Sequence, residues 1–205
     1  MMYLHNDKDD FLEMITYVNE QHDIFSHTVE KDYYVTMLLK LLSEKIPYIV
    51  FKGGTSLSKC YKVIKRFSED IDITIDDNLT QGQKKRVKQA IIDSAAQLGM
   101  TIDNIENIRS RRDYNRYLIS YKSIFPYDEK GVVPTIILET SYISVSFPTN
   151  VLSVSSLIGD VLIENNLDLD DEYGLKPFDM KVQGLERTFV DKIFAICDYY
   201  LQDNI

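Results

Sequence analysis

The spacing of apolar residues predicts that the chain begins with two amphipathic helices. In residues 7–22 and 26–45, apolar positions recur every three or four residues, as they do on the buried face of a helix. Pro47 ends the second stretch. The apolar face of this second helix is made of Tyr34, Met37, Leu38, Leu41 and Leu42. We therefore expect residues 1–46 to form a helical N-terminal part that packs against the rest of the protein.

A different pattern follows and predicts strands. Residues 48–51 are β-branched or aromatic and lead to Gly53-Gly54, where a strand is expected to turn tightly into a helix. Leu57, Cys60, Tyr61 and Ile64 would give that helix its apolar stripe, up to about residue 66. Residues 70–75 then alternate strictly between polar and apolar, which predicts a strand with one buried face.

The rest of the pattern completes an α+β fold. Residues 148–176 mix short patterns and predict no clear element. An amphipathic helix, two strands joined as a hairpin and a closing helix are expected at residues 81–98, 114–121 with 135–144, and 184–201. We predict one domain with a mixed, partly antiparallel sheet flanked by helices. Residues 47–183 would form its sheet-containing catalytic core, and residues 184–205 its C-terminal helix.

Composition indicates an ordinary folded protein. Of the 205 residues, 44% are apolar and 27% charged, which is enough for one well-cored domain. The net charge of −9 excludes the broad basic surface of a protein that coats DNA, so nucleic-acid contact would depend on local clusters. The first ten residues have neither the basic start nor the apolar stretch of a signal peptide, so we expect no secretory leader. No apolar run reaches the roughly 18 residues that span a bilayer, and the cysteine spacing is not typical of a disulfide or zinc framework. We expect a cytoplasmic protein with no membrane partner.

Candidate chemistry lies around the glycine turn. Asp70 and Asp72 are two positions apart on one strand, so their side chains should point to the same face. Carboxylates this close repel each other unless a cation lies between them, and oxygen ligands favour Mg²⁺. Gly53-Gly54 would let backbone N–H groups approach a phosphate at the start of a helix, which Thr55 or Ser56 can cap. Together these are the parts of a phosphoryl-transfer site.

Each of these motifs alone has a plain structural interpretation. A Gly-Gly turn is usually only a turn, and an Asp-x-Asp strand is often a solvated face. Their succession along the chain is what favours the functional interpretation. The glycines match neither the P-loop spacing nor G-x-G-x-x-G, so those two nucleotide-binding motifs are disfavoured.

The segments 52–59, KGGTSLSK, and 66–72, RFSEDID, resemble the signature of AbiEii/AbiGii-type nucleotidyltransferase toxins. A weaker similarity reaches residues 31–34 and the terminal helix. That family supplies the toxin of bacterial type IV toxin–antitoxin and phage abortive-infection systems, within the DNA polymerase β-like nucleotidyltransferase superfamily. The resemblance implies a polymerase β-like nucleotidyltransferase core, an NTP substrate and a cognate antitoxin encoded nearby. Some members studied as toxins add nucleotides to tRNA acceptor ends.

The same resemblance implies roles for individual residues. The metal pair would be Asp70 and Asp72. The nucleotide-binding turn would consist of Gly53, Gly54, Thr55 and Ser56. Three cations near this turn could neutralise phosphate charge, although each also has an interpretation as a plain surface residue: Lys52, Lys59 and Arg66.

Two more residues complete the predicted site. The superfamily normally takes a third acid from a neighbouring strand, and the best position is Glu139 at the end of an apolar run. A strand-end glutamate facing solvent is the alternative. Lys192 lies on the stripe of the terminal helix where an apolar side chain is expected, together with Leu185, Phe189, Ile196 and Tyr199. The resemblance implies that this lysine reaches the triphosphate, and the alternative is a stem that follows the edge of the core with its ammonium in water.

Two basic clusters could contact RNA. One comprises residues 109–112 with Arg116, next to Tyr114 and Tyr117, and the other residues 84–88. The default interpretation is a charged loop for the first and a solvated helix face for the second.

We predict a Mg²⁺-dependent nucleotidyltransferase that transfers NMP from an NTP to an acceptor hydroxyl, with RNA, such as tRNA, as the expected acceptor. The alternatives are a catalytically silent nucleotide- or antitoxin-binding module and transfer onto a small molecule or a protein. Family members usually continue past the lysine helix into further helices, so we expect a short or truncated member.

Overall fold

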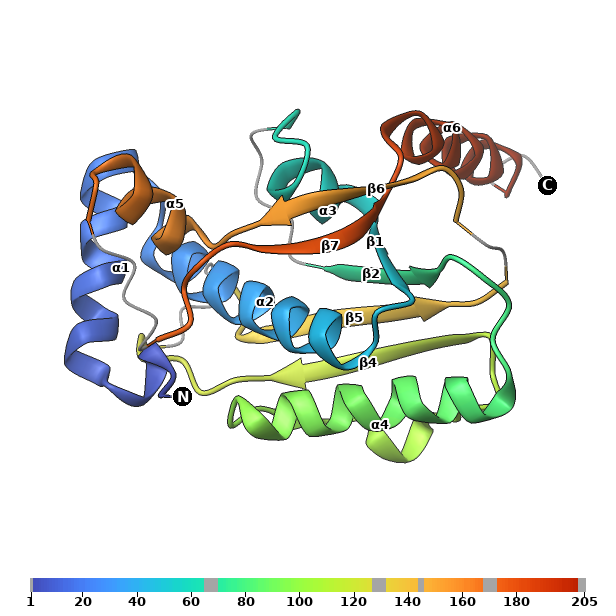
Figure 1. Cartoon of the computed structure of the whole chain (residues 1–205), viewed down its shortest axis with the longest axis horizontal. Helices are drawn as coiled ribbons and strands as arrows, with labels where there is room; N and C mark the ends of the chain where they lie inside the picture. Colours follow the sequence, from blue (N-terminus) through green and yellow to red (C-terminus); the bar gives the residue numbers. More distant parts are fainter. Residues whose placement is uncertain (1, 65–69, 127–131, 144–145, 168–172, 203–205) are drawn as a thin grey trace.

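The computed structural model describes residues 2–64, 70–126, 132–143, 146–167 and 173–202 (Figure 1). The described helices are the 3₁₀ turns η1 (Leu4–Asn6) and η2 (Ile105–Asn107) and the helices α1 (Lys8–His22), α2 (Ser26–Lys45), α3 (Gly53–Lys59), α4 (Gln81–Gln97), α5 (Leu157–Glu164) and α6 (Leu185–Gln202). The described strands are β1 (Ile49–Lys52), β2 (Ile71–Ile75), β3 (Thr101–Ile102), β4 (Tyr114–Ser120), β5 (Thr135–Ser141), β6 (Thr149–Val154) and β7 (Phe178–Gln183). The helices predicted at residues 7–22, 26–45, 81–98 and 184–201 are confirmed.

The strands form one mixed sheet in the order β3-β4-β5-β2-β1-β7-β6. Neighbouring strands are antiparallel except β2 with β5 and β1 with β7, which are parallel. The predicted α+β class, the partly antiparallel sheet and the hairpin of β4 and β5 are therefore confirmed. Since β1 and β2 are central, the strand that leads into the Gly-Gly turn and the strand that carries Asp72 both lie in the middle of the sheet.

Helix α2 is the main buried helix of the fold. It packs against α1, α4 and α5 and lies along the sheet (Figure 1). Its predicted apolar face is buried, and so are the charged residues near its start, which find partners. The Glu30 carboxylate accepts hydrogen bonds from the Ser123 hydroxyl at 2.6 Å and the Ile124 N–H at 2.8 Å. The Lys31 ammonium donates to the Val133 carbonyl at 3.1 Å. These bonds explain why charged side chains are tolerated inside the core.

Helix α3 differs from its prediction at both ends. Lys52 is still extended, with φ −142° and ψ −169°, and the helix begins directly after it at Gly53. Thr55 and Ser56 therefore lie inside the helix, and the prediction that one of them caps it is wrong. The helix ends at Lys59 rather than near residue 66, and Lys62 takes the left-handed conformation with φ 54°, which does not continue a helix.

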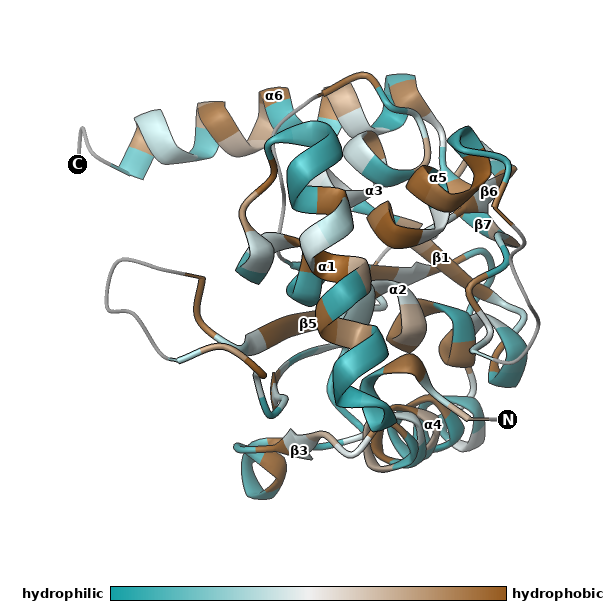
Figure 2. Cartoon of the chain, turned by 90° about the vertical axis from the view of Figure 1, so that its left-hand side faces the viewer, coloured by the Kyte–Doolittle hydropathy of each residue, from teal (hydrophilic) through white to brown (hydrophobic). Residues whose placement is uncertain are grey.

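Helix α6 forms as predicted, but its apolar stripe is not covered. Of its described residues only Thr188 is buried, while Phe189, Ile196 and Tyr199 are 66%, 63% and 68% exposed. Figure 2 shows α6 projecting from the rest of the molecule, with apolar residues distributed along it. The stripe that Lys192 shares with these residues is therefore exposed in the described part of the chain, since an amphipathic pattern specifies a face but not what covers it. The role of Lys192 toward the triphosphate stays a prediction. Among the described helices, none is long and apolar enough to cross a membrane.

Candidate active site

A row of charged side chains crosses the centre of the sheet. Lys52 on β1 is paired with Asp72 on β2, Asp72 with Glu139 on β5, and Glu139 with Arg116 on β4. Residues directly opposite each other on neighbouring strands point to the same face. The row therefore reads cation, carboxylate, carboxylate, cation. The structure brings together Asp72 and Glu139, which the sequence predicted as metal ligands from separate segments.

The electrostatics of Asp72 reflect this crowding. Burial raises the pKa of the Asp72 carboxyl, and the neighbouring Glu139 raises it further, followed more weakly by Asp70. The Lys52 and Lys192 ammonium groups act in the opposite direction and lower this pKa. A half-buried carboxylate beside a second carboxylate is an unfavourable arrangement that a bound cation would relieve.

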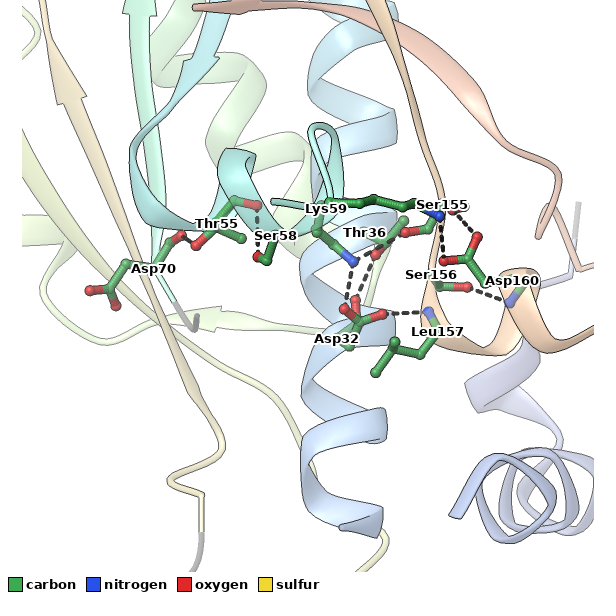
Figure 3. Close-up of polar contacts among 12 residues, drawn as sticks. Asp32, Thr36, Thr55, Ser58, Lys59, Asp70, Ser155, Ser156, Leu157 and Asp160 are labelled. Atoms are coloured by element: carbon green, nitrogen blue, oxygen red, sulfur yellow. Dashed lines mark hydrogen bonds and ion pairs between the residues drawn. The ribbon is translucent and has the colours of Figure 1, made fainter. Parts of the chain in front are cut away.

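Asp70 lies directly before β2 and is exposed, whereas Asp72 is half-buried. The predicted alternation holds on the other face, where Ile71 and Ile73 are buried. The backbone carbonyl of Asp70 accepts a hydrogen bond from the Thr55 hydroxyl, which links α3 to the start of β2 (Figure 3). Within the described ranges, no three His, Cys, Asp or Glu side chains are grouped in a way that could hold a metal ion. The acidic site is thus a close pair, with Asp70 at its rim.

Glu139 has two further neighbours on β4. The Arg116 Nε lies 3.6 Å from the Glu139 Oε1. The Tyr114 hydroxyl donates a hydrogen bond to Glu139, and the pKa of this tyrosine is raised by burial first and by that bond second. Glu139 is about one-third exposed, with 32% of its side-chain surface accessible. The sequence placed Tyr114 and Arg116 in a basic cluster but gave no sign that they adjoin the carboxylates, because that depends on the pairing of β4 with β5.

Gly53 makes the close approach of the turn to Asp72 possible. Its φ is +78°, a left-handed conformation that residues with a side chain rarely adopt. A Cβ atom here would lie 2.0 Å from the Asp72 Oδ2, which is far inside van der Waals contact. The backbone of the turn therefore lies directly against the candidate metal ligand, as a site for a phosphate next to a metal would require.

The two hydroxyl residues of the turn are buried and bonded within the protein. Thr55 donates to the Asp70 carbonyl, and Ser56 donates to the Gly53 carbonyl at 2.8 Å. Their exposed fractions are only 2% and 0%. Both hydroxyls fasten the turn to its surroundings in this structure. A contact between either hydroxyl and a nucleotide stays a prediction.

The three cations predicted near the turn are in different situations. Lys52 belongs to the charged row, next to Asp72. Lys59 does not: its Nζ lies 2.5 Å from the Asp32 Oδ1, on the far side of α3 from the Asp70 carboxylate (Figure 3). Arg66 lies outside the described residues. The structure therefore brings one of these three cations to the carboxylates and assigns a different contact to another.

Lys192 reaches this region because α6 starts where β7 ends. Val182 on β7 is paired with Phe51 on β1, so the chain enters α6 beside the Gly-Gly turn. The buried Gln183 amide fixes that entry, since its Nε2 donates to the Thr188 hydroxyl at 3.1 Å and to the Asp191 carboxylate at 2.9 Å. Lys192 itself is exposed, and its charge acts on Asp72. Sequence analysis missed Gln183, although a buried amide between a strand and a helix is typical of an orienting contact.

The predicted RNA-binding clusters are only partly available. Tyr117 is buried in the core at 1% exposure, and so cannot stack on a base. The Lys84 Nζ pairs with Asp113 at 2.5 Å, and Lys88 donates to the Ile108 carbonyl at 3.0 Å. These contacts support the default interpretation of the lysine cluster as a helix surface. Arg116, from the arginine cluster, belongs to the charged row.

Comparison with known families identifies the family to which the chain belongs. The chain belongs to the family of the nucleotidyl transferase AbiEii toxin of type IV toxin–antitoxin systems, whose profile matches residues 38–204. A search of curated proteins gave no match. The resemblance stated from residues 52–59 and 66–72 is thus confirmed.

Two solved structures are similar to the chain. The nucleotidyltransferase toxin MenT4 from Mycobacterium tuberculosis H37Rv superposes with a TM-score of 0.54 at 18% identity, covering 89% of this chain and 57% of MenT4. A protein from H. pylori described as a nucleotidyltransferase gives a TM-score of 0.45 at 20% identity, covering 82% of this chain and 59% of the other. The first similarity establishes the common fold. The chain spans less than two-thirds of the length of either protein.

Proposed function

We propose that the protein is a Mg²⁺-dependent nucleotidyltransferase toxin that transfers NMP from an NTP to a hydroxyl of RNA. The observation that carries this proposal is the pair Asp72 and Glu139, held side by side in the middle of the sheet with the Gly53 backbone packed against it. Family membership and the MenT4-like fold support the reaction class. The metal, the acceptor and the residue roles are our assignments.

The carboxylates fit a hard divalent cation. The donors are all oxygen, and burial and then the neighbouring Glu139 raise the pKa of Asp72, so a cation between the two carboxylates would be favoured. Mg²⁺ keeps much of its water shell and usually takes one or two protein carboxylates together with substrate phosphates. The pair therefore suffices without a three-ligand cluster. We assign Asp72 and Glu139 as the principal ligands, with Asp70 as an additional ligand at the rim.

The remaining residues bind and orient the nucleotide. Bound Mg²⁺ would stabilise the negative charge that develops on the reacting phosphate. The turn at Gly53 and Gly54 brings backbone N–H groups next to the carboxylates, and Lys52 and Lys192 supply positive charge for the triphosphate. In the reaction, the acceptor oxygen bonds to the α-phosphorus, the bond between this phosphorus and the bridging oxygen to the β-phosphate breaks, and pyrophosphate leaves. The hydroxyl proton passes to solvent.

The acceptor would enter over β4, on the Glu139 side of the row. Arg116 and Tyr114 are both exposed there, Tyr114 at 46%, so they can contact a phosphate and a base of the incoming strand. Lys52 and Lys192 lie on the Asp72 side, where we place the NTP. We further propose that a cognate antitoxin neutralises the protein in the cell, as its toxin family implies.

The test is transfer of label from each α-³²P-labelled NTP to total bacterial RNA in the presence of Mg²⁺, comparing the wild type with Asp72→Asn. We expect labelled RNA with the wild type and none with the variant. Asp93→Asn is the matched control, because Asp93 is an exposed acid on α4 that accepts a hydrogen bond from the Gln89 side chain one turn earlier in the same helix. Equal labelling by Asp72→Asn and the wild type would contradict the metal-pair assignment.

A catalytically silent nucleotide-binding module is the second candidate. It is favoured by one observation: Asp70 is exposed directly before β2, beside the pair that Asp72 and Glu139 form. Calorimetric titration with each NTP separates the two candidates. Binding of an NTP without labelled product on any acceptor would support the silent module and exclude the enzyme.

A further inference from the structure

Among the ion pairs within the described residues, Lys59 and Asp32 have the most buried side chains. The Lys59 Nζ and the Asp32 Oδ1 are 2.5 Å apart, and the two side chains are 7% and 5% exposed. Burying two charges costs much of the energy that their attraction returns, so such a pair is a poor source of stability. Its presence therefore calls for another explanation, and fixing the relative position of two segments is one that the geometry supports.

The pair joins three segments of the chain. Asp32 belongs to α2 and Lys59 is the last residue of α3. The second oxygen of Asp32, Oδ2, accepts a hydrogen bond from the Leu157 N–H at the start of α5, at 2.7 Å. The Lys59 ammonium also donates to the Ser155 carbonyl at 3.1 Å. Figure 3 shows these contacts converging on the end of α3 that is remote from Asp70.

The other end of α3 carries the candidate active site. Gly53, its first residue, lies against the Asp72 carboxylate, and Thr55 donates to the Asp70 carbonyl. Because α3 is only seven residues long, a shift at Lys59 moves Gly53 as well. The ion pair therefore fixes one end of the short helix α3, and the other end contacts Asp70 and Asp72 at the start of β2.

The Lys59 end of α3 borders a pocket. This cavity has a volume of about 310 Å³ and is lined among others by Asp32, Ser58, Lys59 and Lys62. Side chains that face a cavity lack the close contacts that would otherwise fix a helix. The directed contacts of the Lys59 ammonium therefore help to fix where this end of α3 lies.

We propose that Asp32 and Lys59 form a positioning pair for nucleotide transfer: through α3 they keep the Gly53 turn and the Asp70–Asp72 segment in register with Glu139. This inference rests on the proposed function of the carboxylate site. It assigns neither residue a contact with substrate.

The test compares stability with turnover in variants that leave no unpaired buried charge. The double variant Asp32→Asn, Lys59→Met removes both charges together, and replacing a buried ion pair by uncharged residues is often neutral or stabilising. We expect its unfolding midpoint to be no lower than that of the wild type, while kcat for transfer to RNA falls about 10- to 100-fold because the reacting groups are misplaced. The single variant Lys59→Arg keeps the charge and should retain most of the wild-type kcat.

Lys62→Met is the matched control. It removes the neighbouring ion pair with Asp160, whose atoms are 3.2 Å apart at the rim of the same cavity and whose lysine is 63% exposed. This variant should keep the wild-type kcat. If the double variant turns over like the wild type, or if its loss of kcat is matched by Lys62→Met, the positioning role is overturned.

A separate measurement distinguishes failure of this inference from failure of the proposed function. If the wild type itself transfers no nucleotide, the proposed function fails and hydrogen–deuterium exchange decides the positioning question. Faster exchange in residues 53–59 and 70–75 of the double variant, with wild-type exchange in Lys62→Met, would support the inference. Unchanged exchange in both segments would overturn it.

Discussion

The two ends of α3 handle charge in opposite ways. At the Lys59 end, a cation and an anion are paired, buried and further bonded to backbone groups. At the Gly53 end, the carboxylates of Asp72 and Glu139 lie side by side, and the pKa of Asp72 is raised by burial and by that neighbour. An ion pair with further hydrogen bonds fixes the position of the segments that it joins. Two neighbouring carboxylates repel each other, and a bound cation would relieve that repulsion. The contrast separates the residues that position the site from those that bind.

The largest effect is expected from Gly53→Ala, which changes the end of α3 that lies against the Asp72 carboxylate. The new Cβ would lie 2.0 Å from the Asp72 Oδ2, so the carboxylate or the turn must move. We expect transfer to fall by about 100-fold or more, because small displacements of reacting groups are that costly. The left-handed φ of +78° should also cost about 1–2 kcal/mol of stability.

Two other glycines separate the effect of backbone conformation from the effect of the contact with Asp72. Gly99 has φ +66° but nothing within 4 Å of its Cβ position, so Gly99→Ala should lose stability and keep activity. Gly82 lies in α4, where a Cβ would meet only the Thr80 Oγ1 at 3.9 Å. Gly82→Ala should therefore stabilise the protein by about 0.5–1 kcal/mol. Full activity in Gly53→Ala would show that the contact with Asp72 has no role in transfer.

Lys192→Met should give the next largest effect. Lys192 is exposed, so its loss should leave the unfolding midpoint nearly unchanged, while transfer falls about tenfold through the loss of one charge on the triphosphate. Its positive charge lowers the pKa of Asp72, so the pH at which transfer reaches half its maximum should move upward in the variant. Steady-state rates between pH 5 and 9 measure both effects. A tenfold loss with an unmoved pH profile would place Lys192 away from Asp72.

The pH dependence of stability tests the raised pKa of Asp72. Because this pKa is above its ordinary value of 3.8 in the folded protein, the unfolded chain loses its proton first as the pH rises. Asp72 therefore lowers stability increasingly through the window between the two pKa values, and the penalty persists at neutral pH. Asp72→Asn should be more stable than the wild type at pH 7, by about 1.4 kcal/mol for each unit of pKa elevation.

Thermal unfolding of both proteins in EDTA, from pH 3 to pH 8, measures this difference. The gap should close at the acid end, where the carboxyl is protonated in the folded and unfolded states alike. Lys52 and Lys192 reduce the gap because they favour the ionised form. A gap that stays constant with pH would mean that the substitution acts through packing rather than charge.

Local signals made much of the fold predictable. The helical period of α2 and the alternation of β2 are each contained within one element, and both match the structure. The strand β7 was not predicted, although residues 178–183 alternate between apolar and polar as residues 70–75 do, and Met180 and Val182 are buried. This strand was therefore predictable from its own segment. The strand β6 offers less signal, since most of its side chains are not buried.

The candidate site was predictable where it is local and not where it depends on register. Asp72 and Gly53 could be found from short motifs. The contact of Asp32 with Lys59, and of Arg116 with Glu139, arises from packing and strand pairing between distant segments. The sequence consequently grouped Lys59 with the nucleotide-binding residues, whereas the structure places its ammonium on Asp32.

Arg116→Ala should have the smallest effect. It tests the Glu139 side of the charged row, opposite Lys52. The Arg116 guanidinium partly neutralises Glu139, with Nε and Oε1 3.6 Å apart, but both side chains are exposed enough that the pair should contribute little to stability. We expect the unfolding midpoint to change little and the KM for RNA to rise about three- to tenfold, as loss of one phosphate contact implies. The KM for NTP should stay the same, because the nucleotide is placed on the Asp72 side.

Arg112→Ala is the matched control, since Arg112 belongs to the same basic cluster but donates to the Asn107 carbonyl at 3.3 Å. If Arg116 contacts an RNA phosphate, its variant should also show a weaker salt dependence of the KM for RNA than the wild type. Equal changes in the KM for RNA and for NTP would instead mean that Arg116 acts on the shared carboxylates. In that case Glu139 would be a paired carboxylate that positions the site, as Asp32 does, and Asp72 would remain as the carboxylate that binds the ligand.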